Sequence, residues 1–314
     1  MMKAVGSKRS PKGRTLYGHM GKDDNLMNTL PEPKNQAEGL DRDEIKATDE
    51  KASRRFITIP GMDSYKELLQ GFTTRLGGVS KGPFASLNLN FNRPDPKENV
   101  AENYRLLGQT LGVASENMVL SRQVHGNRVE AVDKSYGGMG ILRPRSYEEA
   151  DGLITGEKGL LLITLYADCV PLYFYDPRLG VIGLAHSGWK GTLLNIGAVT
   201  VEALKTHFGS KAGDIRVFFG PHIRSCCFEV GEDVAEQFFN TFASARKTAA
   251  KNAGGKWMLN LEAVITQALE DVGVLPEHIT GAQKCTRCLS ESFFSHRGSG
   301  GNTGTGAAFM MLKN

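Results

Sequence analysis

The feature that most constrains this chain is a pair of polar residues inside an apolar, strand-like stretch. Residues 160–166 read LLLITLY, residues 170–176 read VPLYFYD, and Asp168 and Cys169 lie between them. Runs this apolar are typical of strands that are covered on both faces. Because a carboxylate or thiol there is unfavourable without partners, other parts of the chain are expected to satisfy the pair. Taken alone, the pair also fits a buried thiol beside a carboxylate that bonds a neighbouring turn.

Apolar periodicity predicts alternating strands and helices from residue 56 onward. Strands are predicted at residues 56–60, 71–75, 117–121, 128–132, 151–155, 160–166, 170–176, 181–187, 215–220 and 307–312. Helices with one apolar face are predicted at residues 97–112, 191–208 and 261–272. We therefore predict a mixed α/β (α+β) fold for residues 55–314, a single-domain layered sandwich of mixed β-sheets flanked by helices.

Residues 1–54 differ from the rest, because charged and polar residues dominate them without sustained periodicity. Such a segment lacks the apolar area that would offset its ordering entropy, so we predict a disordered leader or tail. Residues 1–22 are basic and contain no acidic residue, which loosely resembles a transit peptide, although a native tail fits equally well.

Composition argues against several classes of partner. The 38 Lys and Arg residues against 34 Asp and Glu residues give a net charge of +4 that is spread along the chain, which predicts no nucleic-acid partner. The longest apolar stretch, residues 160–175, is broken by Asp168 and Pro171, which predicts no membrane span. Five cysteines without a secretory segment predict reduced thiols and a cytoplasmic protein. The oligomeric state is left open.

Two histidines occupy similar places, each where a strand-like segment meets a glycine-bearing turn. They are His125 in SRQVHGNRV and His186 in VIGLAHSGWKG. Together with Cys169 they form a donor set suited to Zn²⁺, and three protein ligands leave the open position that is typical of catalytic zinc. The spacing is long, so ordinary hydrogen-bonded structural histidines remain an alternative.

The other four cysteines form two short pairs. Cys226 and Cys227 are adjacent in IRSCCFEVG, and Cys285 and Cys288 form a C-x-x-C in KCTRCLSES. Four thiolates suit a structural zinc, and a C-x-x-C also suits redox chemistry. Because adjacent cysteines are an awkward pair for one tetrahedral ion, we favour inert buried thiols.

Two glycine-rich segments carry arginines suited to an anion. Arg75 and Asn88 lie in FTTRLGGVSKGPFASLNLN, and Arg297 lies in FSHRGSGGNTGTG. Glycines let backbone N–H groups approach an anion, and arginine offers a planar fork for phosphate oxygens. These three residues are the predicted substrate or phosphate-binding groups, with solvated surface loops as the alternative.

The chain carries, in this order, QVHG, ADG, ADCVPLYFYDP, GLAHSGWKGT, GPHIRSCCFEVG and CTRCLSESFFSHRG. This run resembles the YfiH/YlmD-type family, also labelled laccase-domain or multicopper polyphenol oxidase proteins, from about residue 71 to residue 309. The resemblance implies one α/β sandwich domain and a zinc held by His125, Cys169 and His186. Two positions depart from the family pattern: Gly298 follows Arg297 where a second arginine is usual, and His222 stands where small residues are common. We do not add His222 to the predicted metal ligands.

The resemblance also implies an activity. The implied enzyme is a zinc-dependent purine nucleoside phosphorylase that acts on adenosine, inosine or 5′-methylthioadenosine together with phosphate. Adenosine deamination is the implied side activity. The three metal ligands and Asp168, our candidate for proton transfer, are the predicted catalytic residues. Arg75, a family site residue, would hold phosphate together with Arg297.

Three other functions stay open at this point. A peptidoglycan-precursor hydrolase of the zinc or cysteine type, which removes L-Ser from a muropeptide, would use Cys169 as a nucleophile rather than as a ligand. A copper-dependent polyphenol oxidase would need several coppers, and the seven histidines include no H-x-H pair, although copper remains an alternative metal. A partner-binding protein with a vestigial metal site is the non-enzymatic alternative.

Overall fold

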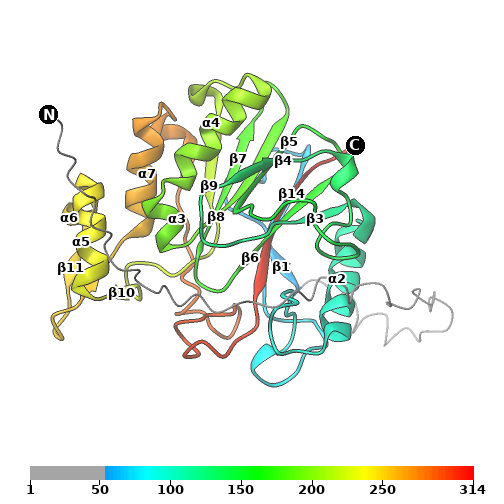
Figure 1. The fold of residues 1–314 in the computed structure, drawn as a ribbon, viewed down its shortest axis with the longest axis horizontal. Helices are drawn as coiled ribbons and strands as arrows, with labels where there is room; N and C mark the ends of the chain where they lie inside the picture. The colour runs from blue at the N-terminus through cyan, green and yellow to red at the C-terminus, as the bar shows by residue number, and fades with distance from the viewer. Residues whose placement is uncertain (1–53) are drawn as a thin grey trace, which may run out of the picture. The chain divides into compact units, whose positions relative to one another are not determined.

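The computed structural model describes residues 54–314. The leader predicted for residues 1–54 lies outside the described residues, apart from Arg54. The described part contains two large mixed sheets and a small antiparallel sheet (Figure 1).

The first large sheet has five strands in the order β1-β2-β14-β6-β3, and the second has six in the order β13-β9-β7-β8-β5-β4. The five are β1 (Phe56–Ile57), β2 (Leu68–Thr73), β14 (Gly306–Leu312), β6 (Leu161–Tyr166) and β3 (Met118–Leu120). The six are β13 (Ile279–Thr280), β9 (Arg216–Phe219), β7 (Val170–Asp176), β8 (Val181–Ser187), β5 (Gly152–Thr155) and β4 (Val129–Ala131). Neighbouring strands are antiparallel except β3–β6, β4–β5 and β13–β9, which are parallel.

The helices and the small sheet complete the described chain. The α-helices are α2 (Lys97–Leu111), α3 (Trp189–Leu193), α4 (Ile196–Phe208), α5 (Glu232–Thr241), α6 (Ala243–Thr248) and α7 (Leu261–Asp271). Short 3₁₀ helices span Gly82–Phe84, Ser115–Asn117, Lys134–Tyr136, Ala212–Asp214 and Pro276–His278. The small sheet pairs β10 (Glu229–Val230), β12 (Trp257–Met258) and β11 (Ala250–Lys251).

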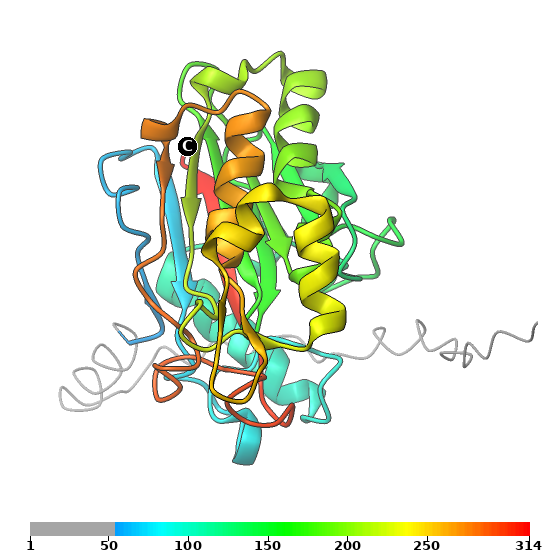
Figure 2. The ribbon, with the colours of Figure 1, turned by 90° about the vertical axis from the view of Figure 1, so that its left-hand side faces the viewer.

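The core is layered because strand residues alternate between two faces. In β7, Tyr173 and Tyr175 pack between the two large sheets, whereas Leu172 and Phe174 pack under the helices of the other face. The helices α4, α5 and α7 cover that outer face, and α2 covers the outer face of the five-stranded sheet (Figures 1 and 2). The predicted mixed α/β sandwich with flanking helices is therefore confirmed.

The structure corrects two local predictions. The helix predicted at residues 191–208 is broken into α3 and α4, because Asn195 adopts a left-handed backbone with φ of 57°. The helices α5 and α6 and the small sheet were not predicted. Helix α5 buries only Ala235 and Phe238, α6 buries only Ala245, and each strand of the small sheet has only two residues. Short elements carry too few repeats for periodicity to reveal them.

The chain passes from the five-stranded to the six-stranded sheet between β3 and β4, and again between β6 and β7. His125 lies in the first crossing, and Asp168 and Cys169 lie in the second. His186 lies near the end of β8, where it pairs with Pro171 of β7. The topology thus brings the three predicted ligands to one end of the sheets.

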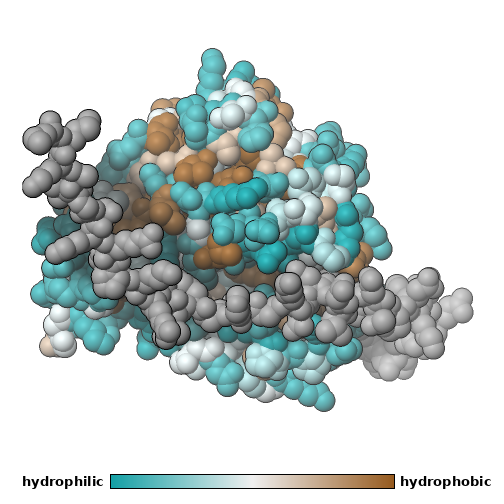
Figure 3. Space-filling view, viewed as in Figure 1, coloured by the Kyte–Doolittle hydropathy of each residue, from teal (hydrophilic) through white to brown (hydrophobic). Residues whose placement is uncertain are grey.

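None of the helices within residues 54–314 is both long and apolar enough to cross a bilayer. On the face drawn in Figure 3, hydrophilic residues surround separate apolar patches.

Candidate metal centre

The three predicted ligands meet at the sheet crossing. One ligand atom from each of His125, Cys169 and His186 lies within 4.8 Å of the others, and His125 Nε2 is 4.0 Å from Cys169 Sγ. A tetrahedral zinc with Zn–N of about 2.0 Å and Zn–S of about 2.3 Å needs its ligand atoms roughly 3.3–3.8 Å apart. The three side chains therefore fit a zinc ion after a small inward adjustment.

One side of this group faces solvent. His125 is exposed and Cys169 is partly exposed, whereas His186 is buried at 3 % exposure. A metal held here by three side chains would keep an accessible fourth position, as catalytic zinc sites do.

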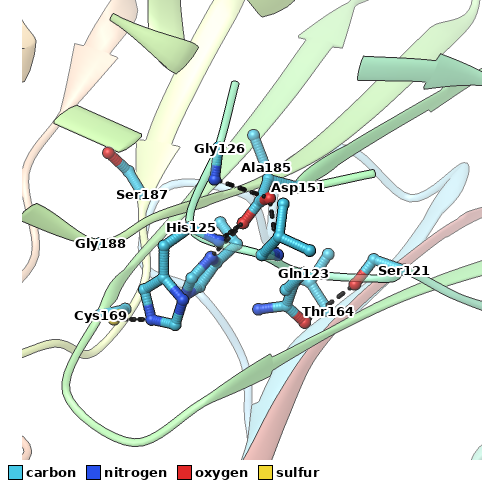
Figure 4. Close-up of polar contacts among 12 residues, drawn as sticks. Ser121, Gln123, His125, Gly126, Asp151, Thr164, Cys169, Ala185, Ser187 and Gly188 are labelled. Atoms are coloured by element: carbon cyan, nitrogen blue, oxygen red, sulfur yellow. Dashed lines mark hydrogen bonds and ion pairs between the residues drawn. The ribbon is translucent and has the colours of Figure 1, made fainter. Parts of the chain in front are cut away.

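Asp151 organises the site from behind (Figure 4). Its carboxylate accepts backbone N–H bonds from Val124, His125 and Gly126 at 2.9–3.1 Å, and it lies 2.8 Å from Nδ1 of His186. Occupying Nδ1 leaves Nε2 of His186 for a metal, which is the common carboxylate–histidine–metal arrangement. One buried carboxylate thus fixes both the His125 loop and the orientation of His186.

Two residues of the site have unusual backbones. His125 has φ of 62° and Asp168 has φ of 89°, in the region that residues with a side chain seldom adopt. Such conformations cost on the order of 1–3 kcal/mol each and persist where the surroundings enforce them. For His125 the enforcing partner is Asp151, and for Asp168 it is a set of four hydrogen bonds.

Those four bonds hold Asp168 from two loops. Its carboxylate accepts from the Thr286 hydroxyl at 2.6 Å, the Ser295 hydroxyl at 3.0 Å and the Arg297 backbone N–H at 2.7 Å. Its carbonyl accepts from the Ile223 N–H at 2.9 Å. Asp168 therefore fixes the direction in which the next residue, Cys169, enters the site.

Gly188 leaves the space that the ligands occupy (Figure 4). A Cβ atom at this position would lie 2.8 Å from Cδ2 of His125 and 3.1 Å from Sγ of Cys169. Any side chain there would displace two of the three ligands.

The partly exposed thiol of Cys169 and the buried imidazole of His186 stabilise each other's charge. Burial by itself would raise the pKa of Cys169 and lower that of His186. The attraction between the two groups, with His125 beside the thiol and Asp151 beside the imidazole, outweighs burial. The pKa of Cys169 consequently falls to about 6 and that of His186 rises to about 9. Near neutral pH the pair is a thiolate and an imidazolium.

The two arginines predicted to bind phosphate lie around the segment that holds Asp168. Arg75 donates to the carbonyls of Ala85 and Ser290 and lies over the ring of Phe294. Arg297 is exposed, and its Nη1 donates to the carbonyl of Glu229 at 2.8 Å. Arg75 thus contacts residues 290–294, and Arg297 stands at the end of the same segment.

Asn88 is placed differently from the two arginines. Its side chain is fully buried, donates to Asp95 at 2.8 Å and accepts from the Thr305 N–H at 3.0 Å. These contacts order the loop after β2, and a role in substrate binding stays a prediction.

Within residues 54–314, a second group of potential metal ligands consists of Cys226, Cys227, Cys285 and Cys288. Cys227 and Cys285 are buried, as predicted for inert thiols, but Cys226 and Cys288 are exposed. His222 is buried beside this group and belongs to neither ligand set.

The fold and the site define a class: a two-sheet α/β protein in which three side chains that could hold a metal ion meet, accessible to solvent, where the chain crosses between the sheets. Residues 69–313 match the family model described as multi-copper polyphenol oxidoreductase laccase. The chain belongs to this family, which agrees with the resemblance to the YfiH/YlmD type.

The chain is similar to several curated proteins and solved structures. It is 35% identical over 252 residues to "Purine nucleoside phosphorylase YlmD" of Bacillus subtilis, covering 79% of this chain and 90% of that protein. It is 32% identical over 241 residues to "Adenosine deaminase RL5" of an unknown prokaryotic organism, covering 76% and 92%. The crystal structure of YlmD from Geobacillus stearothermophilus superimposes with a TM-score of 0.78 at 35% identity, covering 83% of this chain and 97% of that one.

Asp151 is a site residue that the sequence did not predict, although it belongs to the ADG motif. It stands in ADG, directly before a strand whose residues are all buried, so its carboxylate required a partner. That partner, His186, lies 35 residues away on β8, and only the β5–β8 pairing reveals it.

Proposed function

We propose that this chain is a zinc-dependent purine nucleoside phosphorylase that acts on adenosine, inosine or 5′-methylthioadenosine, with adenosine deamination as a side activity. One observation carries the proposal: two imidazole nitrogens and a thiol gather within 4.8 Å in a chain that is 35% identical to a protein named purine nucleoside phosphorylase. The partners are then small molecules, a nucleoside and phosphate.

The ligand residues support zinc through their chemistry. Nitrogen and sulfur donors suit Zn²⁺, and a zinc ion with an open position supplies a Lewis acid that polarises an oxygen and makes water more acidic. Asp151 keeps Nδ1 of His186 engaged, so that Nε2 would be the nitrogen that holds a zinc ion. Asp168 holds the strained turn that aims Cys169. Copper accepts the same donors, so metal analysis is part of the test.

In phosphorolysis, an oxygen of phosphate bonds to C1′ of the ribose while the bond from C1′ to N9 of the purine breaks. The electron pair of that bond stays on N9, and the departing base takes up a proton. We propose that Arg75 and Arg297 hold the phosphate, because arginine forks match phosphate oxygens, Arg75 lies over Phe294, and Arg297 belongs to the same segment. Binding phosphate and nucleoside side by side removes much of the entropic cost of bringing the two reactants together.

In deamination, water adds at C6 of adenosine and ammonia leaves. Support for this side activity is the similarity to a protein named adenosine deaminase. Asp168 remains the proposed proton-transfer group for this reaction, as predicted from its place beside Cys169. Its carboxylate accepts from three donors, which supports a positioning role in addition.

The deciding experiment incubates the zinc-loaded protein with adenosine, with and without phosphate, and separates the products by chromatography. Base and ribose-1-phosphate that form only with phosphate establish phosphorolysis, and inosine that forms without phosphate establishes deamination. Metal content is measured on the same sample. Absence of both products at full zinc occupancy would overturn the proposal.

A second candidate function is supported by the state of Cys169. A partly exposed thiol with a pKa of about 6 beside an imidazolium is an activated nucleophile, as a peptidoglycan-precursor hydrolase would need. The two functions respond oppositely to chelation. Release of L-Ser from a muropeptide by metal-free protein would favour the hydrolase, whereas activity that requires zinc favours the phosphorylase.

A further inference from the structure

The four remaining cysteines converge from two distant loops. Cys226 and Cys227 lie between β9 and β10, and Cys285 and Cys288 lie between β13 and β14. Their four sulfur atoms lie within 4.8 Å of one another. The structure thus gathers four of the chain's five thiols in one place.

The spacing of the sulfurs matches a shared ion. Sγ of Cys288 is 3.4 Å from Sγ of Cys227 and 3.7 Å from Sγ of Cys226. Four thiolates around one zinc at about 2.3 Å stand roughly 3.8 Å apart. A disulfide joins two sulfurs at about 2.0 Å and gives no reason for two more to approach. Convergence of all four therefore points to a central ion.

Backbone contacts hold the two loops at this spacing. His222 and Cys285 form a parallel bridge, and the Thr286 N–H donates to the His222 carbonyl at 3.0 Å. The Cys227 N–H donates to the carbonyl of Arg224 at 2.8 Å, which turns the first loop back on itself. The thiols are therefore positioned by backbone that does not depend on them.

The surroundings also suit an anionic centre. Four thiolates and one Zn²⁺ carry a net charge of −2, which needs nearby positive groups. Nη1 of Arg287 donates to Sγ of Cys227 at 3.4 Å. Arg297 donates to the carbonyls of Cys227 and Glu229, which brings a second guanidinium close to the group.

We propose that Cys226, Cys227, Cys285 and Cys288 bind a structural zinc ion, separate from the ion of the three-ligand site. Four protein ligands fill a tetrahedral shell and leave no position for substrate, so this ion joins the two loops and takes no part in chemistry. The proposal does not rest on the function of the three-ligand site.

The site has a consequence for Asp168. Ile223 belongs to the first cysteine loop and Thr286 to the second, and both donate hydrogen bonds to Asp168. Joining the loops therefore holds both donors in place. The second ion would stabilise the turn that delivers Cys169 to the first.

The test counts zinc in a Cys169→Ala background, which removes the only cysteine outside the group. We expect two zinc ions per chain in the wild type, one in Cys169→Ala, and none when Cys226→Ser and Cys288→Ser are added to it. Zinc absent from Cys169→Ala, or unchanged by the two serine substitutions, would overturn the proposal. Nucleoside turnover is not measured, so a negative result leaves the proposed function untouched.

A second measurement covers the case in which the serine variants do not fold. Cobalt replaces zinc in the Cys169→Ala protein, where any thiolate-to-cobalt absorption must come from the four cysteines. We expect this absorption together with the visible bands of tetrahedral cobalt. Their absence, or disulfides found by mass spectrometry in protein kept under reducing conditions, would overturn the proposal.

Discussion

The two ligand groups of this chain differ in how the fold supports them. His125, Cys169 and His186 come from the crossings and strands of the large sheets, and Asp151 fixes their orientation. The four cysteines come from two loops outside the large sheets. The first group mixes nitrogen and sulfur donors and has an exposed side, whereas the second offers four thiols, as many as a tetrahedral ion can bind. The first group thus lies at the ends of the strands of the large sheets, whereas the second joins two loops that backbone hydrogen bonds already hold together.

The largest expected effect is the loss of nucleoside turnover when Cys169 of the three-ligand group is replaced. Cys169→Ala should lower nucleoside turnover roughly 1000-fold, because loss of a metal ligand removes several kcal/mol of transition-state stabilisation. Product formation by chromatography checks this. The control is Leu179→Ala at the far end of the β7–β8 hairpin, where the side chain is exposed. Equal turnover in the wild type and Cys169→Ala would contradict the assignment of the first group.

The second effect is the pH dependence of stability at His222, which lies beside the four cysteines. His222 is buried, and burial lowers its pKa to about 4, so it stays neutral in the folded protein where an unfolded chain with a pKa of about 6.5 takes up a proton. The free energy of unfolding should therefore fall by about 3 kcal/mol as pH drops from about 6.5 to about 4.

His222→Asn tests this contribution. Its amide can donate to the Gly220 carbonyl that lies 3.0 Å from Nδ1 of His222, and it does not titrate. Glu262, whose pKa burial raises, is the carboxyl group that faces His222 at 3.6 Å. Denaturant unfolding at several pH values should show a smaller decline in the variant than in the wild type. Parallel curves would refute the neutral, buried state of His222.

The third effect is a loss of zinc affinity at the three-ligand group alone. Asp151→Asn should weaken zinc binding at the three-ligand site by about 10–100-fold, since loss of a carboxylate behind a metal-bound histidine typically has that effect. Competition with a chromophoric chelator measures the affinity, and the ion at the four cysteines should be unaffected. Asp133→Asn, an exposed carboxylate that caps a 3₁₀ helix, serves as the matched control. Equal weakening of both ions would show that the variant perturbs the fold as a whole.

The smallest effect tests the link between the groups. Thr286→Val removes the 2.6 Å bond to Asp168 and keeps the side-chain shape. A hydrogen bond to a charged group contributes about 1.5 kcal/mol or more, so kcat/KM should fall about tenfold while zinc stays at two per chain. Thr248→Val, whose hydroxyl bonds the carbonyl of Ser244 at the surface, is the control. Unchanged kcat/KM would show that the cysteine loops do not position Cys169.

Much of the fold could be predicted because its central strands are buried on both faces. The runs that became β6, β7 and β8 are mostly apolar and almost entirely buried, and the faces of α2 and α7 repeat with helical period. The break at Asn195 could not be predicted, because a left-handed residue inside a helical pattern leaves the periodicity intact. The residue types of His125, Cys169 and His186 suggested a set of metal ligands, but the sequence could not show that their ligand atoms lie within 4.8 Å of one another.

The sequence by itself determined the element pattern of the core, the residue types of both ligand groups and, through its motifs, the family. Side-chain chemistry and apolar periodicity are local properties, so they can be read along the chain. Only the tertiary structure decided that Asp151 supports His186 and that cysteines about 60 residues apart meet, because both depend on strand pairing and loop packing between distant segments. It also showed that both cysteine loops hold Asp168, through Ile223 from the first loop and through Thr286 from the second.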